Sequence, residues 1–577
     1  MKKNFKNIWK VLNHSQKKKF YTLTALIILG MLSELLSIGM VFPVVSILFD
    51  TGNETAIYLQ NIYGIFFSEI NYQQVVIISL LLLLFVYFLK NLLLTFIAKI
   101  EVKKIMDIKF EITEKLYKKF IFYPFTFHSN INSSNLINFT KDQIDSFGNS
   151  LFNCIILMAE ILIIIGVLII LFIVEPIGTL IILLFSFSFG YIFYNLMKKE
   201  ISFLSKVRFD NNSLKIKNLQ ETFGAIKEIK IYNKENFFLN SFNFFNKKVI
   251  NIEGYETFLK RLPRLWFEFL CVLIFVLFLI FKSFFDKANL ISLTPILGLF
   301  GVAVIRVIPS INRIVLAVQT INFGEAAITM INENLEKNLQ DEKLKYINAA
   351  PLKFEKRINF ENISFNFNNS NKVFDEINLI IEKKDFVGIF GETGVGKSTL
   401  LNLLLGLIHP TKGEIKVDDI NIKDNLLSWQ SKIGFVPQNI YLLDESIAKN
   451  IAFGFDNKKI NYKRLTSAIK DSQLEKFVND LPNGVETLVG ERGAQISGGQ
   501  LQRIGIARAL YINPDILIFD ESTSSLDNQT EIKIMETINS IKKDKTIIFV
   551  SHKKNPMEYC NKLYELKKNQ LISIEKV

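Results

Sequence analysis

The chain contains very little cysteine and histidine, and this scarcity excludes several kinds of site. Its 577 residues include three cysteines and four histidines. Cys154, Cys271 and Cys560 are too few and too scattered for a disulfide framework or a cysteine-based metal centre. Two of them lie in apolar runs. We therefore expect buried thiols without a chemical role.

Acidic residues are also fewer than basic ones, and the formal net charge is +13. A basic excess of this size can indicate a nucleic-acid partner. However, 49% of the residues are hydrophobic, 53 are phenylalanine, and 21% are charged. Such a composition requires apolar and charged regions to be segregated, as in a membrane protein. A cleavable signal peptide is not evident, since the first apolar run is too long and no small-residue cleavage site follows it.

Apolar runs long enough to cross a bilayer occur six times before residue 330. We place them near residues 21–48, 73–100, 147–174, 177–197, 265–285 and 291–322. Pro43, Pro295 and Pro309 interrupt them, but such prolines are tolerated as kinks where helices pack on neighbours. The sequence thus predicts an all-α membrane domain of six transmembrane helices over residues 1–330, followed by a linker over 331–356.

Lysine and arginine collect in alternate connections between these runs. The segments 1–19, 101–146 and 198–264 are rich in lysine, whereas 49–72 has no basic residue and 284–290 has only Lys287. The positive-inside rule then places the N-terminus and everything after residue 330 in the cytosol. We expect a multi-pass protein of the inner (plasma) membrane. Nucleic-acid binding would not produce this alternation, so we reject it.

The second half of the chain opens with a phosphate-binding loop. Residues 391–398 read GETGVGKS, between an expected strand at 386–390 and a helix expected to open at Ser398. Glycines let backbone N–H groups close on phosphate oxygens at a helix N-terminus. We expect Lys397 to reach the β- and γ-phosphates of ATP, and Ser398 to ligate Mg²⁺. The expected ATP contacts are Gly391, Glu392, Thr393, Gly394, Val395, Gly396, Lys397, Ser398 and Thr399.

Two carboxylates follow a second buried strand. The apolar run 516–519 ends in Asp520 and Glu521. Asp520 is placed to hold Mg²⁺, and Glu521 to polarise the attacking water. His552 follows the β-like run 546–550 and is expected to sense the γ-phosphate. Gln438 could reach the metal or the water from a loop.

A second phosphate-ready helix start lies between these motifs. Ser497, Gly498, Gly499 and Gln500 precede a stretch of helical pattern over 501–510. A helix N-terminus presents unpaired N–H groups and a positive dipole end to an anion.

The order of these motifs resembles the nucleotide-binding domain of ABC transporters over residues 357–577. The sequence departs from the family pattern in minor ways. Ile496 replaces a leucine, SSLD at Ser524–Asp527 replaces SALD, and Phe367 stands where an adenine-stacking tyrosine is usual. None of these changes removes a phosphate-contacting group, and the Phe367 ring can still stack.

The resemblance implies an ATP hydrolase coupled to transport. In this family two such domains sandwich two ATP molecules, and the signature at Ser497–Gln500 completes the site on the partner's loop. One membrane domain and one ATPase per chain imply a half-transporter, and we expect a homodimer. Glu491, Arg492 and Gly493 resemble a loop that senses the membrane domain. The segments Tyr123–Leu136 and Glu221–Glu235 resemble the coupling helices of exporters, although ordinary solvated helices would have the same pattern.

Five basic residues mark a candidate substrate cavity in the membrane half, where charges are costly unless they face water or a partner. Arg306 and Arg313 are seven residues apart and would share one helix face. A row of guanidiniums suits a phosphate or pyrophosphate group. Alternatively, Arg313 snorkels to the cytosolic interface. The complete candidate set is Lys90, Arg261, Arg264, Arg306 and Arg313.

Residues 56–67 predict a short amphipathic helix on the outer interface. Together with the first and sixth spans, this segment resembles the PglK-type flippases of lipid-linked oligosaccharides. The resemblance implies ATP-driven flipping of a polyprenyl-pyrophosphate-linked oligosaccharide to the outer leaflet. A multidrug or lipid A-type exporter is the alternative.

Overall fold

The computed structural model describes most of the chain. The described residues are 2–49, 63, 71–174, 176–285, 307, 309–336, 352–367, 372–490, 493–521, 527–541, 544–552 and 555–574. They form two compact units. The first comprises Met1–Tyr123 and Asn130–Leu339, and the second comprises Pro124–Ser129 and Gln340–Val577.

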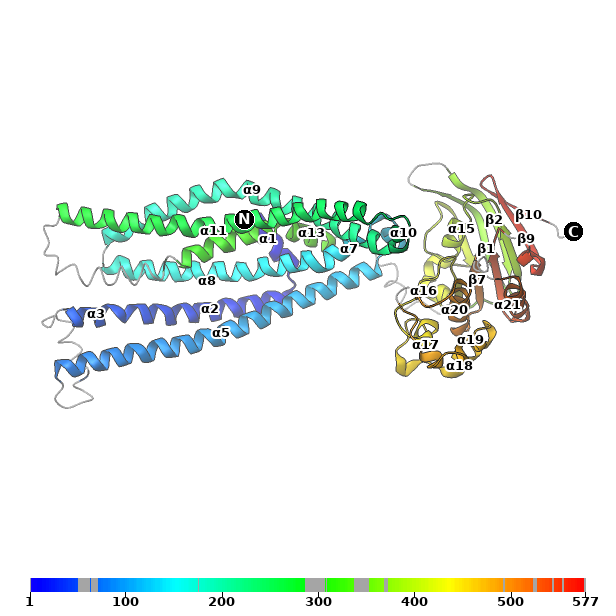
Figure 1. Ribbon diagram of the computed structural model, residues 1–577, viewed down its shortest axis with the longest axis horizontal. Coiled ribbons are helices and arrows are strands. Elements are labelled where there is room, and N and C mark those ends of the chain that lie inside the picture. Colours follow the sequence, from blue (N-terminus) through cyan, green and yellow to red (C-terminus); the bar gives the residue numbers. More distant parts are fainter. Residues whose placement is uncertain are drawn as a thin grey trace. The chain divides into compact units, whose positions relative to one another are not determined.

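The first unit is built from helices (Figure 1). They are α1 (Lys2–Val11), α2 (His14–Gly39), α3 (Val41–Phe49), α5 (Tyr72–Phe122), α7 (Ser133–Asn138), the π-helical η1 (Phe139–Gln143), α8 (Ile144–Val174), α9 (Pro176–Gly224), α10 (Ile226–Ile231), α11 (Glu235–Phe285), a helix over Pro309–Phe323, and α13 (Glu325–Glu336). The short α6 (Phe125–Asn130) falls almost entirely in the second unit.

The long helices run side by side (Figure 1). Helix α2 packs against α5 and α8, and α9 packs along α11. Spacing explains the packing: Ile105, Ile108, Ile112 and Leu116 recur three or four residues apart on α5, and all four are buried. This period places them on one helix face. Elsewhere on α5, large apolar side chains such as Phe85 are exposed, as expected for a surface that faces lipid.

Three helical segments of the described chain are long and apolar enough to cross a membrane. They lie at His14–Val45, Tyr72–Phe122 and Ser133–Ile173. A fourth is added if the bent pair Pro309–Phe323 and Glu325–Glu336 counts as one span. The predicted count of six spans is therefore not established and stays a prediction.

One predicted span is divided between two helices, and another is followed by a bend. The first is divided between α2 and α3 at Met40, three residues before Pro43. The chain turns by 49° between the helices Pro309–Phe323 and Glu325–Glu336, just beyond the last predicted span. Gly324 lies at this bend, where an added Cβ would meet the Ser150 hydroxyl oxygen at 2.0 Å. A larger residue here would require the Ser150 hydroxyl or the helix itself to shift.

The second unit contains two sheets. One is four-stranded with the order β2-β1-β4-β5, and the other is six-stranded with the order β10-β9-β3-β8-β7-β6. The strands are β1 (Arg357–Asn366), β2 (Lys372–Glu382), β3 (Phe386–Phe390), β4 (Lys412–Val417), β5 (Ile420–Asn421), β6 (Ile433–Val436), β7 (Ile516–Asp520), β8 (Thr546–Val550), β9 (Lys562–Lys567) and β10 (Gln570–Ile574).

Helices and short 3₁₀ turns connect these strands. They are α15 (Lys397–Leu404), η2 (Ile422–Asn425), α16 (Leu426–Ser431), α17 (Ile447–Ile451), η3 (Asn457–Lys459), α18 (Tyr462–Asp471), α19 (Glu475–Asn479), η4 (Gly484–Glu486), α20 (Gly498–Tyr511), α21 (Asn528–Ile541) and η6 (Asn555–Tyr559). The second unit is thus an α/β domain, as the sequence predicted.

Parallel pairing at the centre of the six-stranded sheet positions the candidate site. Strand β3 pairs with β8 and β9, and β7 pairs with β6 and β8, all of them parallel. The carboxyl ends of parallel strands meet at one edge of a sheet, where open α/β sheets bind their ligands. The predicted motifs follow β3, β6, β7 and β8, so this edge collects them.

The boundary between the units differs in detail from the expected one. Helix α13 continues to Glu336, beyond residue 330. Leu352 and Phe354, which the sequence analysis assigned to the linker, are buried in the same core cluster as β1 and β2. Burial of these two apolar side chains stabilises a slightly longer second domain.

Candidate functional site

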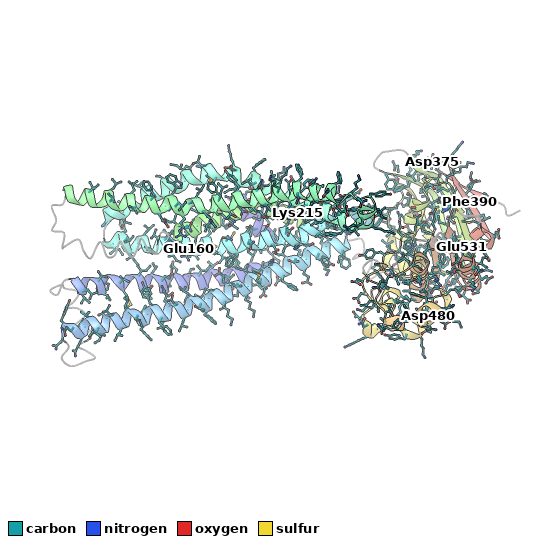
Figure 2. All side chains as sticks on the ribbon, in the orientation of Figure 1. Glu160, Lys215, Asp375, Phe390, Asp480 and Glu531 are labelled. Atoms are coloured by element: carbon teal, nitrogen blue, oxygen red, sulfur yellow. The ribbon has the colours of Figure 1, made fainter. Side chains whose placement is uncertain are left out.

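The glycine-rich loop joins β3 to α15 as the sequence predicted. Figure 2 labels Phe390, the last residue of β3. Helix α15 begins at Lys397, one residue earlier than expected. Gly394 and Gly396 have φ angles of 90° and 106°, a region that side chains make unfavourable. A Cβ on Gly396 would also lie 3.0–3.1 Å from Val373 and Phe374.

The Lys397 side chain folds back over this loop. It is only 8% exposed. Its ammonium group donates to the carbonyl oxygens of Gly391 at 2.7 Å and Glu392 at 3.1 Å. These bonds hold the cation beside the backbone amides of the loop. A positive charge therefore lies at the loop where the phosphate pattern predicted an anion.

Glu521 is the centre of the polar cluster at the sheet edge. Its carboxylate accepts a hydrogen bond from Gln438 Nε2 at 2.9 Å, lies 3.2 Å from His552 Nδ1, and lies 3.8 Å from Lys397 Nζ. The backbone fixes its position, since Glu521 has φ of 46° and its N–H donates to the Val550 carbonyl at 2.8 Å. The structure thus brings together four residues that the sequence predicted separately.

Asp520 lies beside this cluster at the end of β7. Burial raises the pKa of its carboxyl group above the usual range, the neighbouring Glu521 carboxylate raises it further, and Lys397 lowers it. Two adjacent carboxylates that repel each other in a partly buried place form a site that a cation would stabilise. The Ser398 hydroxyl is exposed in the first turn of α15. These residues fit the predicted Mg²⁺ site.

A helix follows the second predicted phosphate-binding motif, but it begins at Gly498, earlier than the expected residue 501, and Ser497 is the N-cap of this helix, α20. The Ser497 N–H donates to Gln500 Oε1 at 2.9 Å, and the Gln500 N–H donates to Ser497 Oγ at 3.4 Å. This capping box stabilises the helix start. Ser497 and Gly498 are exposed, so the N-terminus of α20 can be approached by another molecule.

Other predicted residues of this domain have mixed outcomes. Phe367 is 52% exposed, and its ring meets Phe365 edge-on at 4.8 Å. Stacking of this ring on adenine stays a prediction. Glu491, Arg492 and the residues from Ser524 to Leu526 lie outside the part of the chain that the structure describes.

Short helices form in both segments predicted to couple the domains. Helix α6 begins just after Pro124, and α10 spans Ile226–Ile231. Pro124–Ser129 belongs to the second unit although its neighbours in sequence belong to the first. Coupling itself stays a prediction.

Four of the five predicted cavity residues lie in the described part of the chain: Lys90, Arg261, Arg264 and Arg313. Lys90 on α5 lies 4.4 Å above the ring of Tyr87. Arg264 on α11 donates to Glu268 at 3.1 Å, and both side chains are exposed. Arg261 is exposed on the same helix. Arg306 and the amphipathic segment 56–67, apart from Tyr63, lie outside the described residues.

Arg313 has a partner that the sequence analysis missed. Its Nε lies 2.7 Å from Oε1 of Glu160 on α8, and the exposed fractions of the two side chains are 44% and 7%. Figure 2 labels Glu160 on α8. A single acid in the apolar run LMAEILIII could have been found by the same rule that selected the arginines.

Fold and site together define a P-loop nucleotide-binding protein with a helical membrane domain. The profile of the ABC transporter transmembrane region matches residues 10–306, and the ABC transporter profile matches residues 374–524. The first of these matches alone covers more than half of the chain. The chain belongs to the ABC transporter family, whose ATP-binding domain is an ATPase coupled to transport.

Relatives match part of the chain at moderate identity. ABC transporter B family member 6 of Dictyostelium discoideum is 38% identical over 224 residues, which cover 37% of this chain and 33% of that protein. The ATP-dependent lipid A-core flippase of Coxiella burnetii is 34% identical over 276 residues, or 47% of this chain and 46% of that protein. A Staphylococcus aureus relative named "Putative multidrug export ATP-binding/permease protein" is 36% identical over 229 residues, or 39% of each chain. The matches thus span a third to a half of these relatives.

A solved structure resembles almost the whole chain. The bacterial Atm1-family ABC exporter with ATP bound superposes with a TM-score of 0.81 at 18% identity, covering 97% of this chain and 95% of that chain. At this identity the likeness establishes the exporter fold, a helical membrane domain followed by a nucleotide-binding domain.

Proposed function

We propose that this chain is a half-transporter that hydrolyses ATP to export or flip an anionic lipid, a polyprenyl-pyrophosphate-linked oligosaccharide, from the inner to the outer leaflet. The observation that carries the ATPase part is the convergence of Gln438, His552 and Lys397 on Glu521. A carboxylate held by two polar neighbours beside a phosphate loop has the arrangement of a base for water.

Each residue has a distinct task in this proposal. Lys397 and the backbone amides after Gly394 bind and orient the β- and γ-phosphates. Glu521 accepts a proton from water, Gln438 orients that water, and His552 donates to the γ-phosphate. Mg²⁺, when bound by Ser398, Asp520 and Gln438, neutralises charge on the phosphate oxygens. Phe367 stacks on the adenine ring.

We further propose that two copies act together. The N-terminus of α20 is exposed at Ser497 and Gly498, and a helix start of this kind binds an anion best when it points at the phosphates directly. A second copy would supply its own Ser497–Gln500 to the first copy's loop. Approach of the two ATPase domains then drives alternating access of the membrane helices. The N-terminus and both ATPase domains lie in the cytosol, at the inner membrane.

The proposed cargo rests on the membrane half. The Arg313 side chain is 44% exposed. On the same helix, Ile311 and Val315 pack against apolar side chains of α11. A guanidinium exposed in this way is costly against lipid tails, so it faces a water-filled cavity. There it would meet the head group of the lipid. Lys90, Arg261, Arg264 and Arg306 are proposed to extend this site.

A multidrug or lipid A-type exporter is equally supported. The Coxiella burnetii relative is named a lipid A-core flippase and the Staphylococcus aureus relative a multidrug exporter. Both alternatives use the same ATPase. A multidrug exporter would not require the arginines, whereas lipid A also carries phosphate.

Charge reversal tests the cargo. Purified protein in proteoliposomes is assayed for ATPase stimulation and for flipping with a polyprenyl pyrophosphate, its oligosaccharide derivative, lipid A and a neutral polyprenol. We expect the pyrophosphate lipids to stimulate the wild type and to lose most of that stimulation in Arg306→Glu and Arg313→Glu. Equal stimulation of these variants and the wild type would refute the anionic cavity.

A further inference from the structure

The side chain of Glu160 occupies an unusual place in the helical unit. On α8 it is followed by Ile163, Val167 and Leu171, and all four are buried. This spacing of three and four residues forms one stripe. The three apolar members pack in a cluster with Ile38. Glu160 thus places a carboxylate in line with an apolar stripe. Packing of the helices does not require a charged side chain at this position.

The position of Glu160 along the helix places it well inside the predicted span. Helix α8 ends at Val174. At 1.5 Å per residue, Glu160 lies about 21 Å along the axis from that end, within a hydrocarbon core about 30 Å thick. Arg313 meets Glu160 at this level of the predicted span. A carboxylate in such a place is a functional candidate by default.

The geometry of the pair leaves part of the guanidinium available. The carboxylate contacts Arg313 through Nε. No described residue accepts a hydrogen bond from its two terminal nitrogens. An arginine has five N–H donors in a rigid planar fork. A contact at Nε therefore fixes the plane of the fork and leaves its outer edge without a partner among the described residues.

From this arrangement we infer that Glu160 is a positioning residue, which holds Arg313 so that its outer edge binds a phosphate group of the lipid in a bidentate manner. The inference rests on the proposed function. The unused side-chain oxygen of Glu160 is buried and accepts no hydrogen bond within the described part of the chain. It therefore cannot reach the cargo, and Glu160 acts only through Arg313. Bidentate recognition depends on orientation, so it is sensitive to the loss of this support.

Glu160→Gln in proteoliposomes tests the role. The readouts are basal ATPase activity and the concentration of polyprenyl pyrophosphate that gives half-maximal stimulation, with neutral polyprenol as the reference lipid. Because a hydrogen bond to a charged group is lost or misdirected, we expect this concentration to rise about tenfold. Basal ATPase activity should stay within about twofold. Asp145→Asn is the matched control, since Asp145 lies on the same helix and its carboxylate pairs with Lys109 at 2.5 Å; it should change neither readout.

A double-mutant cycle separates positioning from a structural role. In an Arg313→Gln background, Glu160→Gln should add no further loss, because there is no guanidinium left to orient. An equal loss in both backgrounds, or an equal fall of basal and stimulated activity, would overturn the inference. If Glu160→Gln does not yield folded protein, Glu160→Asp keeps the charge but withdraws the carboxylate by one methylene. It should then raise the half-maximal concentration, and a wild-type value would overturn the inference.

The same experiment separates the two levels of the proposal. Absence of stimulation of the wild type by every phosphorylated lipid would refute the proposed cargo. Stimulation of the wild type that Glu160→Gln leaves unchanged would refute only the positioning role.

Discussion

Replacement of Glu521 by glutamine should stop hydrolysis while leaving ATP binding intact. Glutamine has the same length and keeps one oxygen, so the backbone conformation at φ 46° and the contact to Gln438 can persist. Lys397 keeps its two bonds to the loop carbonyls, which do not involve Glu521. The substitution therefore removes the base without removing the phosphate cradle.

The size of the effect follows from the role of the carboxylate. A positioned general base contributes about 10²- to 10⁴-fold to a rate, which corresponds to about 3–5 kcal/mol of activation free energy. We expect the rate of phosphate release at saturating Mg²⁺ and ATP to fall by at least about a hundredfold. The dissociation constant of a fluorescent ATP analogue should change by less than about threefold, or about 0.7 kcal/mol.

Glu536→Gln provides the matched control for this assay. Glu536 is exposed on α21, so its replacement removes the same charge from the same domain without touching the cluster. It should hydrolyse ATP at the wild-type rate. Hydrolysis by the Glu521→Gln protein at a rate within about threefold of the control would refute the assignment of Glu521 as the base.

Three further substitutions test the supporting geometry. Gly396→Ala places a Cβ 3.0–3.1 Å from Val373 and Phe374 at a φ of 106°; about 1–3 kcal/mol of strain should weaken ATP binding about tenfold or more in a nucleotide titration. Ser497→Ala removes the N-cap of α20 and should cost about 1 kcal/mol in a denaturation curve, together with most of the ATPase activity if a second copy uses this helix start. Asp520→Asn should abolish Mg²⁺-dependent ATPase activity yet raise the thermal midpoint at pH 7.5, because burial and Glu521 raise the pKa of Asp520 and so disfavour its ionised form in the folded domain. That gain should shrink as the pH falls through the raised pKa and vanish below its ordinary value of 3.8; an equal gain at all pH values would contradict it.

The sequence indicated which strands end at the candidate ATP site because its motifs are local. Strand β3 and strand β8 have the predicted bounds, and α20 follows the predicted motif, although it begins at Gly498 rather than at residue 501. Parallel strands carry residues at their carboxyl ends to one edge, so the meeting of Glu521 and His552 follows from the order of the motifs. The conformation of Glu521 was not predictable, since a positive φ at a glutamate depends on its bond to Val550.

In the membrane half, the sequence predicted the approximate positions of helices but not the contacts between them. Apolar runs indicate where a helix lies, but they do not fix how it rotates against its neighbours. The partner of Arg313 depends on that rotation, and it turned out to be Glu160. The predicted cavity residues also differ in surroundings that no motif specifies: Arg264 has an acid one turn away on its own helix, whereas Lys90 lies over a tyrosine ring.

Strand order in the six-stranded sheet has a consequence for how this domain can be synthesised. Both neighbours of β3 are encoded far downstream, since Phe386 pairs with Ile547 and Val387 with Lys562. While the ribosome makes the intervening residues, the strand that carries the phosphate loop has two unpaired edges. Unpaired strand edges are templates for aggregation, and such distant pairings form slowly. We expect this strand to depend on a chaperone until β8 and β9 emerge.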